Sequence, residues 1–190
     1  EATNMLDYKD TSGRIVGEIG AVVKQVDPRE AERLAAELMT AEKVFLMAVG
    51  RVFLSLQCLG KRLGHLGMDC QVVGAVNEKP IGSKDLLLIA SGSGESKLPA
   101  EIARIAKSKG AKLGLITSAK TSTIKSISDF AVHLPCPTKT DANAGFSSIQ
   151  PMSALFDQCL HVFGDAVALM IQDARGLKKE ELWRYHANLE

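Results

Sequence analysis

Short apolar runs alternate along this chain with longer stretches in which apolar residues recur every three or four positions. The apolar runs predict five β-strands, at residues 43–49, 70–75, 85–90, 111–117 and 130–134. The third run contains Leu86-Leu87-Leu88-Ile89-Ala90, which is apolar at every position. A strand of this kind is covered on both faces, as in a parallel sheet.

Helical stretches fill the gaps between these strands. Residues 51–66 and 96–109 carry apolar side chains at helical spacing, and the second stretch stops at Gly110, a usual helix terminator. Strands that alternate with helices predict right-handed crossovers and an α/β fold, a three-layer αβα sandwich around a five-stranded parallel sheet. Folds of this type bind ligands beyond the carboxyl ends of the strands.

Helical extensions are expected at both ends of a single domain that spans residues 1–190. Residues 1–42 form a helical prefix, in which Asp27-Pro28 opens the second helix. Residues 43–135 form the sheet core, and residues 151–190 hold C-terminal helices, of which the first runs to about residue 174. Between them, residues 136–150 are rich in Pro, Thr, Asn and Gly, and either cover a ligand or form a disordered surface excursion.

Composition narrows the classes of partner. A net charge of +1 and an aromatic fraction of 5% argue against a nucleic-acid-binding surface. No run of about 18 apolar residues occurs, so we expect no membrane span. The four cysteines have neither CxxC spacing nor a neighbouring histidine, so we expect no metal site and a reducing, cytoplasmic location. The polar start of the sequence does not have the pattern of a secretory signal.

The most informative segment is the loop between the third strand and the following helix. It consists of Ser91, Gly92, Ser93, Gly94, Glu95 and Ser96. Glycines bring backbone N–H groups close to an anion, the helix start adds the positive end of its dipole, and the hydroxyls add donors. The loop is neither a Walker A sequence nor a dinucleotide fingerprint. A plain turn capped by Ser96 explains that residue, but not the interleaved serines and glycines, so we predict a phosphate site.

Together with three other segments, this loop resembles a known family. The segments are Val49-Gly50-Arg51, the stretch from Gln150 to Gln158 that opens the long helix, and the ending His186-Ala187-Asn188-Leu189-Glu190. The loop is similar to the signature of SIS (sugar isomerase) domains. The ending is specific to the 6-phospho-3-hexuloisomerases within that group, and the resemblance extends over nearly the whole chain.

The resemblance implies a flavodoxin-like sheet, a homotetramer, and an intramolecular oxidoreductase that needs no metal or organic cofactor. The implied reaction interconverts 3-hexulose 6-phosphate and fructose 6-phosphate during formaldehyde fixation through ribulose monophosphate. The substrate would lie against residues 91–96, Arg51 and Val52. Val52 stands where the family has a serine, so a hydroxyl that assists the substrate is missing.

The resemblance also implies catalytic side chains. Asp157 stands where the family has a glutamate base, and it is one methylene shorter. His186 and His65 are the candidates for assisting at the substrate oxygens. From the residues alone, Asp157 is better explained as a solvated helix flank, where it could pair with His161, and His186 as a surface residue. His65 could either cap the end of its helix or face the ligand.

Two other functions remain open from the sequence. One is a module that binds a sugar phosphate without catalysis, and the other is an isomerase for a different sugar phosphate, such as arabinose 5-phosphate. A sugar phosphate is the expected small-molecule partner in each case.

Overall fold

The computed structural model describes residues 5–137 and 147–189, and it places five strands in one parallel sheet. The strand order is β2-β1-β3-β4-β5. The strands are β1 (Val44–Met47), β2 (Cys70–Val72), β3 (Leu86–Ala90), β4 (Lys112–Thr117) and β5 (Phe130–His133). Each lies within the segment predicted for it, and the predicted three-layer sandwich with a five-stranded parallel sheet is confirmed.

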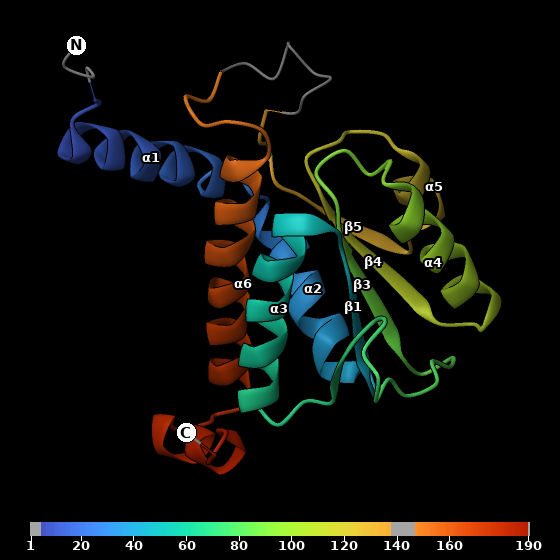
Figure 1. The fold of residues 1–190 in the computed structure, drawn as a ribbon. Coiled ribbons are helices and arrows are strands. Elements are labelled where there is room, and N and C mark those ends of the chain that lie inside the picture. The colour runs from blue at the N-terminus through green and yellow to red at the C-terminus, as the bar shows by residue number, and fades with distance from the viewer. Residues whose placement is uncertain (1–4, 138–146, 190) are drawn as a thin grey trace.

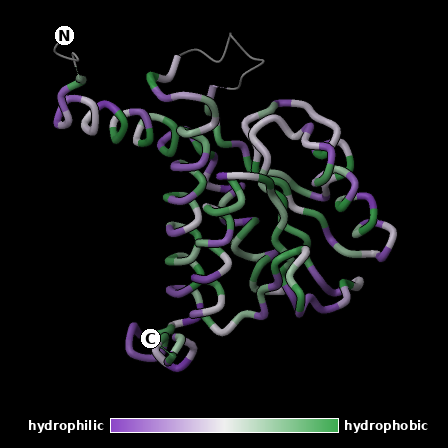
Figure 2. Tube along the Cα trace, viewed as in Figure 1, coloured by the Kyte–Doolittle hydropathy of each residue, from purple (hydrophilic) through white to green (hydrophobic). Residues whose placement is uncertain are grey.

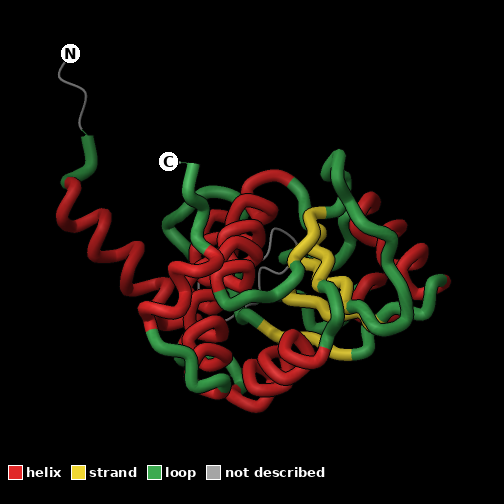
Figure 3. Tube along the Cα trace, turned by 90° about the horizontal axis from the view of Figure 1, so that it is seen from below, coloured by secondary structure: helices red, strands yellow, loops and turns green. Residues whose placement is uncertain are grey.

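Helices cover both faces of the sheet (Figure 1). The helices are α1 (Tyr8–Val23), α2 (Pro28–Thr40), α3 (Gly50–His65), α4 (Lys97–Ser108), α5 (Thr123–Ile127), α6 (Ala154–Ala174) and the 3-10 helix η1 (Lys179–Tyr185). One face is packed by α2 and α3, with α6 against them, and the other by α4 and α5. Seen from below, the strands lie between these two groups of helices (Figure 3).

The sequence of β3 explains why it lies at the centre of the sheet. Leu86, Leu88 and Ala90 face the cluster shared with α2, α3 and α6, whereas Leu87 and Ile89 face α4 and α5. All five are at most 1% exposed. Because neither face meets water, a strand here needs apolar residues at every position. The tube coloured by hydropathy shows the same apolar interior (Figure 2).

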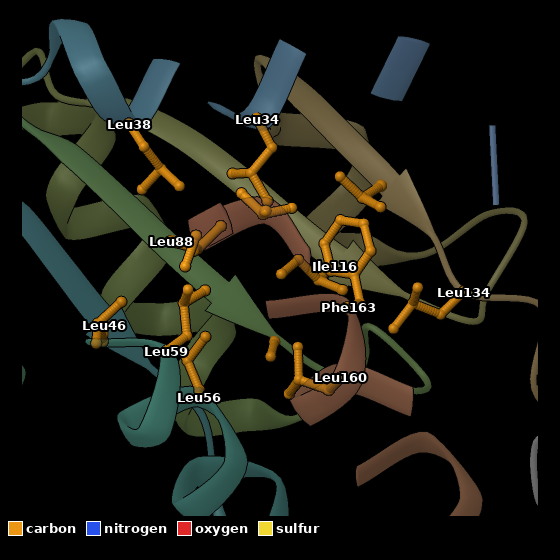
Figure 4. Close-up of a cluster of buried hydrophobic side chains, with 14 of the residues drawn as sticks. Leu34, Leu38, Leu46, Leu56, Leu59, Leu88, Ile116, Leu134, Leu160 and Phe163 are labelled. Carbon is orange, nitrogen blue, oxygen red and sulfur yellow. The ribbon is translucent and has the colours of Figure 1, made fainter. Parts of the chain in front are cut away.

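The larger core cluster joins side chains from the sheet and from helices α2, α3 and α6 (Figure 4). Leu160 and Phe163 of α6 reach this cluster together with Leu56 and Leu59 of α3. Gly164 lets the two helices approach closely, because a Cβ there would lie 3.3 Å from Leu59 Cβ. The buried apolar face of α6 therefore packs inside the molecule.

Truncating Leu160 should destabilise the protein strongly. Its side chain is 0% exposed, so Leu160→Ala leaves a cavity and should lower the free energy of unfolding by about 2–5 kcal/mol. Leu98 is the control, because it also lies in a helix, α4, and is 59% exposed. Leu98→Ala should change the free energy by less than about 0.5 kcal/mol. Urea unfolding of both variants measures the difference, and equal losses would contradict the packing described for α6.

Both extensions are helical, as predicted, and α2 begins at Pro28 with Asp27 as its N-cap. The long helix begins at Ala154, three residues after the predicted start. The sequence pattern did not predict α5 or the 3-10 character of η1, which are too short to show a period. Residues 138–146, which make up most of the predicted loop 136–150, lie outside the described residues, so its role as a cover is untested.

Helix α6 also bears on the expectation that no membrane span exists. By length and composition, it is the one described helix that could cross a bilayer. However, 56% of its most apolar window is buried inside the molecule, against α3 and α2. A buried core helix of a globular domain has these properties.

Candidate active site

The serine-rich loop, defined as residues 91–96, follows β3 at the carboxyl edge of the sheet and leads into α4. Two contacts attach it to the end of β4: Gly92 O accepts hydrogen bonds from Ser118 N at 3.1 Å and from Thr117 Oγ1 at 3.2 Å. A third attaches it to α5, where Ile124 N donates to Gly94 O at 3.1 Å. The loop is therefore held on a rigid support, as a preorganised binding site requires.

The serine side chains of the loop face one another and its own backbone. Gly94 N donates to Ser91 Oγ at 3.0 Å, and Ser91 Oγ lies 3.2 Å from Ser96 Oγ. Ser93 Oγ accepts from Glu95 N at 3.2 Å. These small contacts shape a tight turn, and no bulky side chain takes part in them.

Ser96 occupies the N-cap position of α4, but its side chain makes no capping hydrogen bond. One reason lies at the third helical position, where Pro99 has no N–H group for a cap to accept. The first N–H groups of α4 therefore have no acceptor from the cap side chain. Donors at a helix start that are not satisfied by the chain favour an anion.

Position 94 of the loop requires a residue without a side chain. Its φ is +66°, in the left-handed region that favours glycine. A Cβ at this position would lie 2.5 Å from Ser122 Cβ, at the start of α5. The turn and the close approach to α5 both depend on this glycine.

Glu95 points away from the centre of the loop. Its Oε1 accepts a hydrogen bond from Thr123 N at 2.8 Å. Hydrogen bonding to Thr123 lowers the pKa of the Glu95 carboxyl. The carboxylate is therefore held by its hydrogen bond to the first residue of α5.

Asp157 lies in the first turn of α6 and is 1% exposed. Arg51 Nε, from the first turn of α3, lies 2.8 Å from Asp157 Oδ2. Burial raises the pKa of Asp157, while the charge of Arg51 and hydrogen bonding to Arg51 and Ser153 oppose that rise. The solvated helix flank allowed by the sequence is therefore wrong for this aspartate.

Asp157 and the serine-rich loop belong to the same edge of the molecule. A Cβ on Gly92 would lie 3.7 Å from the ring of Phe156, the residue before Asp157, so the loop touches the first turn of α6. Arg51 starts from the same edge, because β1 and β3 pair in register up to Met47 and Ile89. The structure thus brings together the loop, Arg51 and Asp157.

Val52 follows Arg51 on α3, but its side chain is directed differently. It is half-buried and packs against the larger core cluster. It supplies no hydroxyl, and its place among core side chains suits an apolar residue.

His65 and His186 lie together, but away from Asp157. Their rings stack with centroids 5.0 Å apart, and His186 also lies 5.0 Å from the ring of Trp183. His65 is the last residue of α3, whereas Arg51 is its second. The fourteen helical steps from Arg51 to His65, at 1.5 Å each, place the two residues about 21 Å apart along the helix. Within one chain, the structure does not bring these histidines to Asp157.

The histidine end of α3 borders a groove of its own. The groove has a volume of about 430 Å³, and its lining includes His65, Tyr185, Lys61, Met68 and Cys70. Burial raises the pKa of the Cys70 thiol to about 12, so this cysteine stays protonated. Among the described residues, no three His, Cys, Asp or Glu side chains gather as metal ligands would.

Sequence reasoning missed the contribution of the last residue of β4 and the residue that follows it. Thr117 and Ser118 are 0% and 8% exposed, and both bond to Gly92 O of the serine-rich loop. Ser118 Oγ is buried and has no hydrogen-bond partner among the described residues. The sequence contained a signal for this contribution, namely polar residues at the ends of neighbouring strands. In a parallel sheet such residues meet at one edge.

Comparison with known proteins identifies the family of this chain. The model of the SIS domain family matches residues 37–162. A 3-hexulose-6-phosphate isomerase of Bacillus subtilis (strain 168) is 33% identical over 176 residues, which are 93% of this chain and 95% of that protein. The 3-hexulose-6-phosphate isomerase of Mycobacterium gastri is 35% identical over 184 residues, covering 97% and 92% of the two chains.

A solved structure shows the same fold. It belongs to a Methanococcus jannaschii protein whose structure was described as inferring a molecular function of 3-hexulose-6-phosphate isomerase. The TM-score is 0.82 at 24% identity, over 95% of this chain and 99% of the other. The matched family model covers β1 to the first half of α6, including the serine-rich loop, Arg51 and Asp157. This chain belongs to the SIS domain family.

Proposed function

We propose that this protein is a phosphosugar isomerase that interconverts 3-hexulose 6-phosphate and fructose 6-phosphate. The observation that carries the proposal is the meeting of an anion-binding loop, residues 91–96, with a buried carboxylate, Asp157, at one edge of the sheet. The two relatives at 33% and 35% identity bear the name of that activity. We place the reaction in formaldehyde fixation through ribulose monophosphate, in the cytoplasm.

The loop binds the phosphate group. Two kinds of donor are available there: the first N–H groups of α4 and the hydroxyls of Ser91, Ser93 and Ser96. The dipole of α4 adds a favourable field for a dianion. With a net charge of only +1, the protein must hold an anionic substrate by such local donors.

Asp157 transfers the proton. Moving the ketone from C3 to C2 requires that the carboxylate take the proton from C2, which forms an enediol, and return a proton to C3. The hydroxyl proton passes from O2 to O3, so that atoms and charge balance without a cofactor. Burial raises the pKa of Asp157, and a base whose pKa is nearer the working pH is a better proton shuttle.

A coupled assay tests the function. The protein is supplied with 3-hexulose 6-phosphate, and the appearance of fructose 6-phosphate is followed. Turnover that depends on protein concentration supports the isomerase. Binding of the substrate without turnover at any pH would favour the non-catalytic module, and turnover of arabinose 5-phosphate alone would favour the other isomerase.

We further propose that the protein forms a homotetramer in which His65 and His186 act at the site of a neighbouring copy. Two observations support this: the stacked histidines lie about 21 Å along α3 from Arg51, and apolar side chains remain exposed on α1 and α6. These include Tyr8 at 81%, Val16 at 66% and Leu169 at 65%. Helix α1 also projects from the body of the molecule (Figure 1).

Complementation measures whether the site is shared. An Asp157→Asn variant and a double His65→Ala, His186→Ala variant should each be inactive alone. Co-expressed with different tags and purified as mixed oligomers, they should regain activity well above the sum of the two. A fully active histidine variant, or mixed oligomers that stay inactive, would contradict the shared site.

A further inference from the structure

The proposed base is not directly accessible. Asp157 is 1% exposed, so a substrate carbon cannot reach its carboxylate unless a covering group moves. Arg51, which forms an ion pair with Asp157, is exposed: 63% of its side chain is open to solvent. A buried carboxylate therefore lies beneath a solvent-exposed guanidinium.

Other charged groups around α6 do not take the place of Arg51. Glu18, on α1, accepts hydrogen bonds from residues 148–150. Glu30, on α2, accepts from His133 N, and Glu95 accepts from Thr123 N. On α6 itself, His161 lies 3.7 Å from Asp165.

Arg51 is well placed to change partners. Val49, the N-cap of α3, makes no side-chain capping bond, and Gly50 has a φ of +58°. Extending the pairing of β1 with β3 by two residues puts Val49 opposite Ser91, so Arg51 begins beside the serine-rich loop. Arginine binds carboxylates and phosphates through the same planar donors. A phosphate dianion in the loop would therefore compete with Asp157 for the guanidinium.

We propose that Arg51 gates the base: it pairs with Asp157 in the empty site and is drawn to the substrate phosphate on binding, which uncovers the carboxylate. The inference rests on the proposed role of Asp157. It makes Arg51 a positioning residue that couples the arrival of the phosphate to the availability of the base. A carboxylate that loses its cationic partner also binds protons more tightly.

The gate has a signature in the dependence of rate on pH. The acidic limb of the kcat/KM profile reports the pKa of the base in the free enzyme. The acidic limb of the kcat profile reports the pKa of the same base in the substrate complex. If Arg51 leaves Asp157 on binding, the acidic limb of kcat should lie at higher pH than that of kcat/KM, by roughly one unit. In Arg51→Gln, both limbs should coincide at the higher pH, because no guanidinium pairs with Asp157 in either state. The variant should also raise KM roughly tenfold, through loss of a charged hydrogen bond to the phosphate.

Arg104→Gln is the matched control. Arg104 pairs with Glu101 on α4 at 3.0 Å, and both side chains are more than half exposed. It should keep the separation of the two limbs. Coincident limbs in the wild-type enzyme, or limbs that stay apart in Arg51→Gln, would overturn the gate. A wild-type rate in Asp157→Asn would instead overturn the proposed base, so the two failures are distinguishable.

Discussion

Asp157→Asn should reduce the conversion of 3-hexulose 6-phosphate at least about a hundredfold, since general-base catalysis contributes about 10²–10⁴. The amide has nearly the shape of the carboxylate but cannot accept the C2 proton. It also leaves the buried site without a charge, so the loss should appear in kcat rather than in stability. Steady-state kinetics in the coupled assay, with the melting temperature measured in parallel, test this.

Asp165→Asn is the control for that experiment. Asp165 lies eight residues further along α6 and is about half exposed, in ion pairs at 3.7 Å and 3.8 Å. Exposed pairs of this kind contribute little, so the rate should stay near that of the wild type. If Asp157→Asn kept a comparable rate, Asp157 would have no part in proton transfer.

The second large effect is expected at Gly94. Gly94→Ala places a side chain in the left-handed region, which costs about 1–2 kcal/mol, and drives its Cβ against Ser122. Relief requires the loop and the start of α5 to separate, which displaces the phosphate donors. Because displacements near 1 Å lower rates by about a hundredfold, kcat/KM should fall on that scale.

Gly17→Ala separates this effect from a general response to replacing glycine. Gly17 lies within α1, and a Cβ there would have no atom within 4 Å. Alanine should stabilise the helix by about 0.5–1 kcal/mol and leave kcat/KM unchanged. Kinetics and inorganic-phosphate binding on both variants test the loop. An unaltered affinity for phosphate in Gly94→Ala would show that residues 91–96 do not hold the anion.

Features that depend on neighbours in sequence were predictable. The strand β3 is apolar at every position because helices cover both of its faces, and the loop that follows shows its serines and glycines in one continuous segment. The start of α2 could also be predicted from neighbouring residues, since Asp27 caps the helix and Pro28 suits its first position. Short elements such as α5 escaped prediction, because five residues are too few to show a helical period.

The amino-acid sequence alone determined the layers of this protein, the order of its elements and the place of its serine-rich loop, because hydrophobic period and turn chemistry act over a few residues. Only the tertiary structure decided that Arg51 pairs with Asp157, that Thr117 and Ser118 support the loop, and that both histidines stand at the far end of α3. These relations join residues that are distant along the chain. They follow from where parallel strands end and how helices pack on the sheet, which no local pattern encodes.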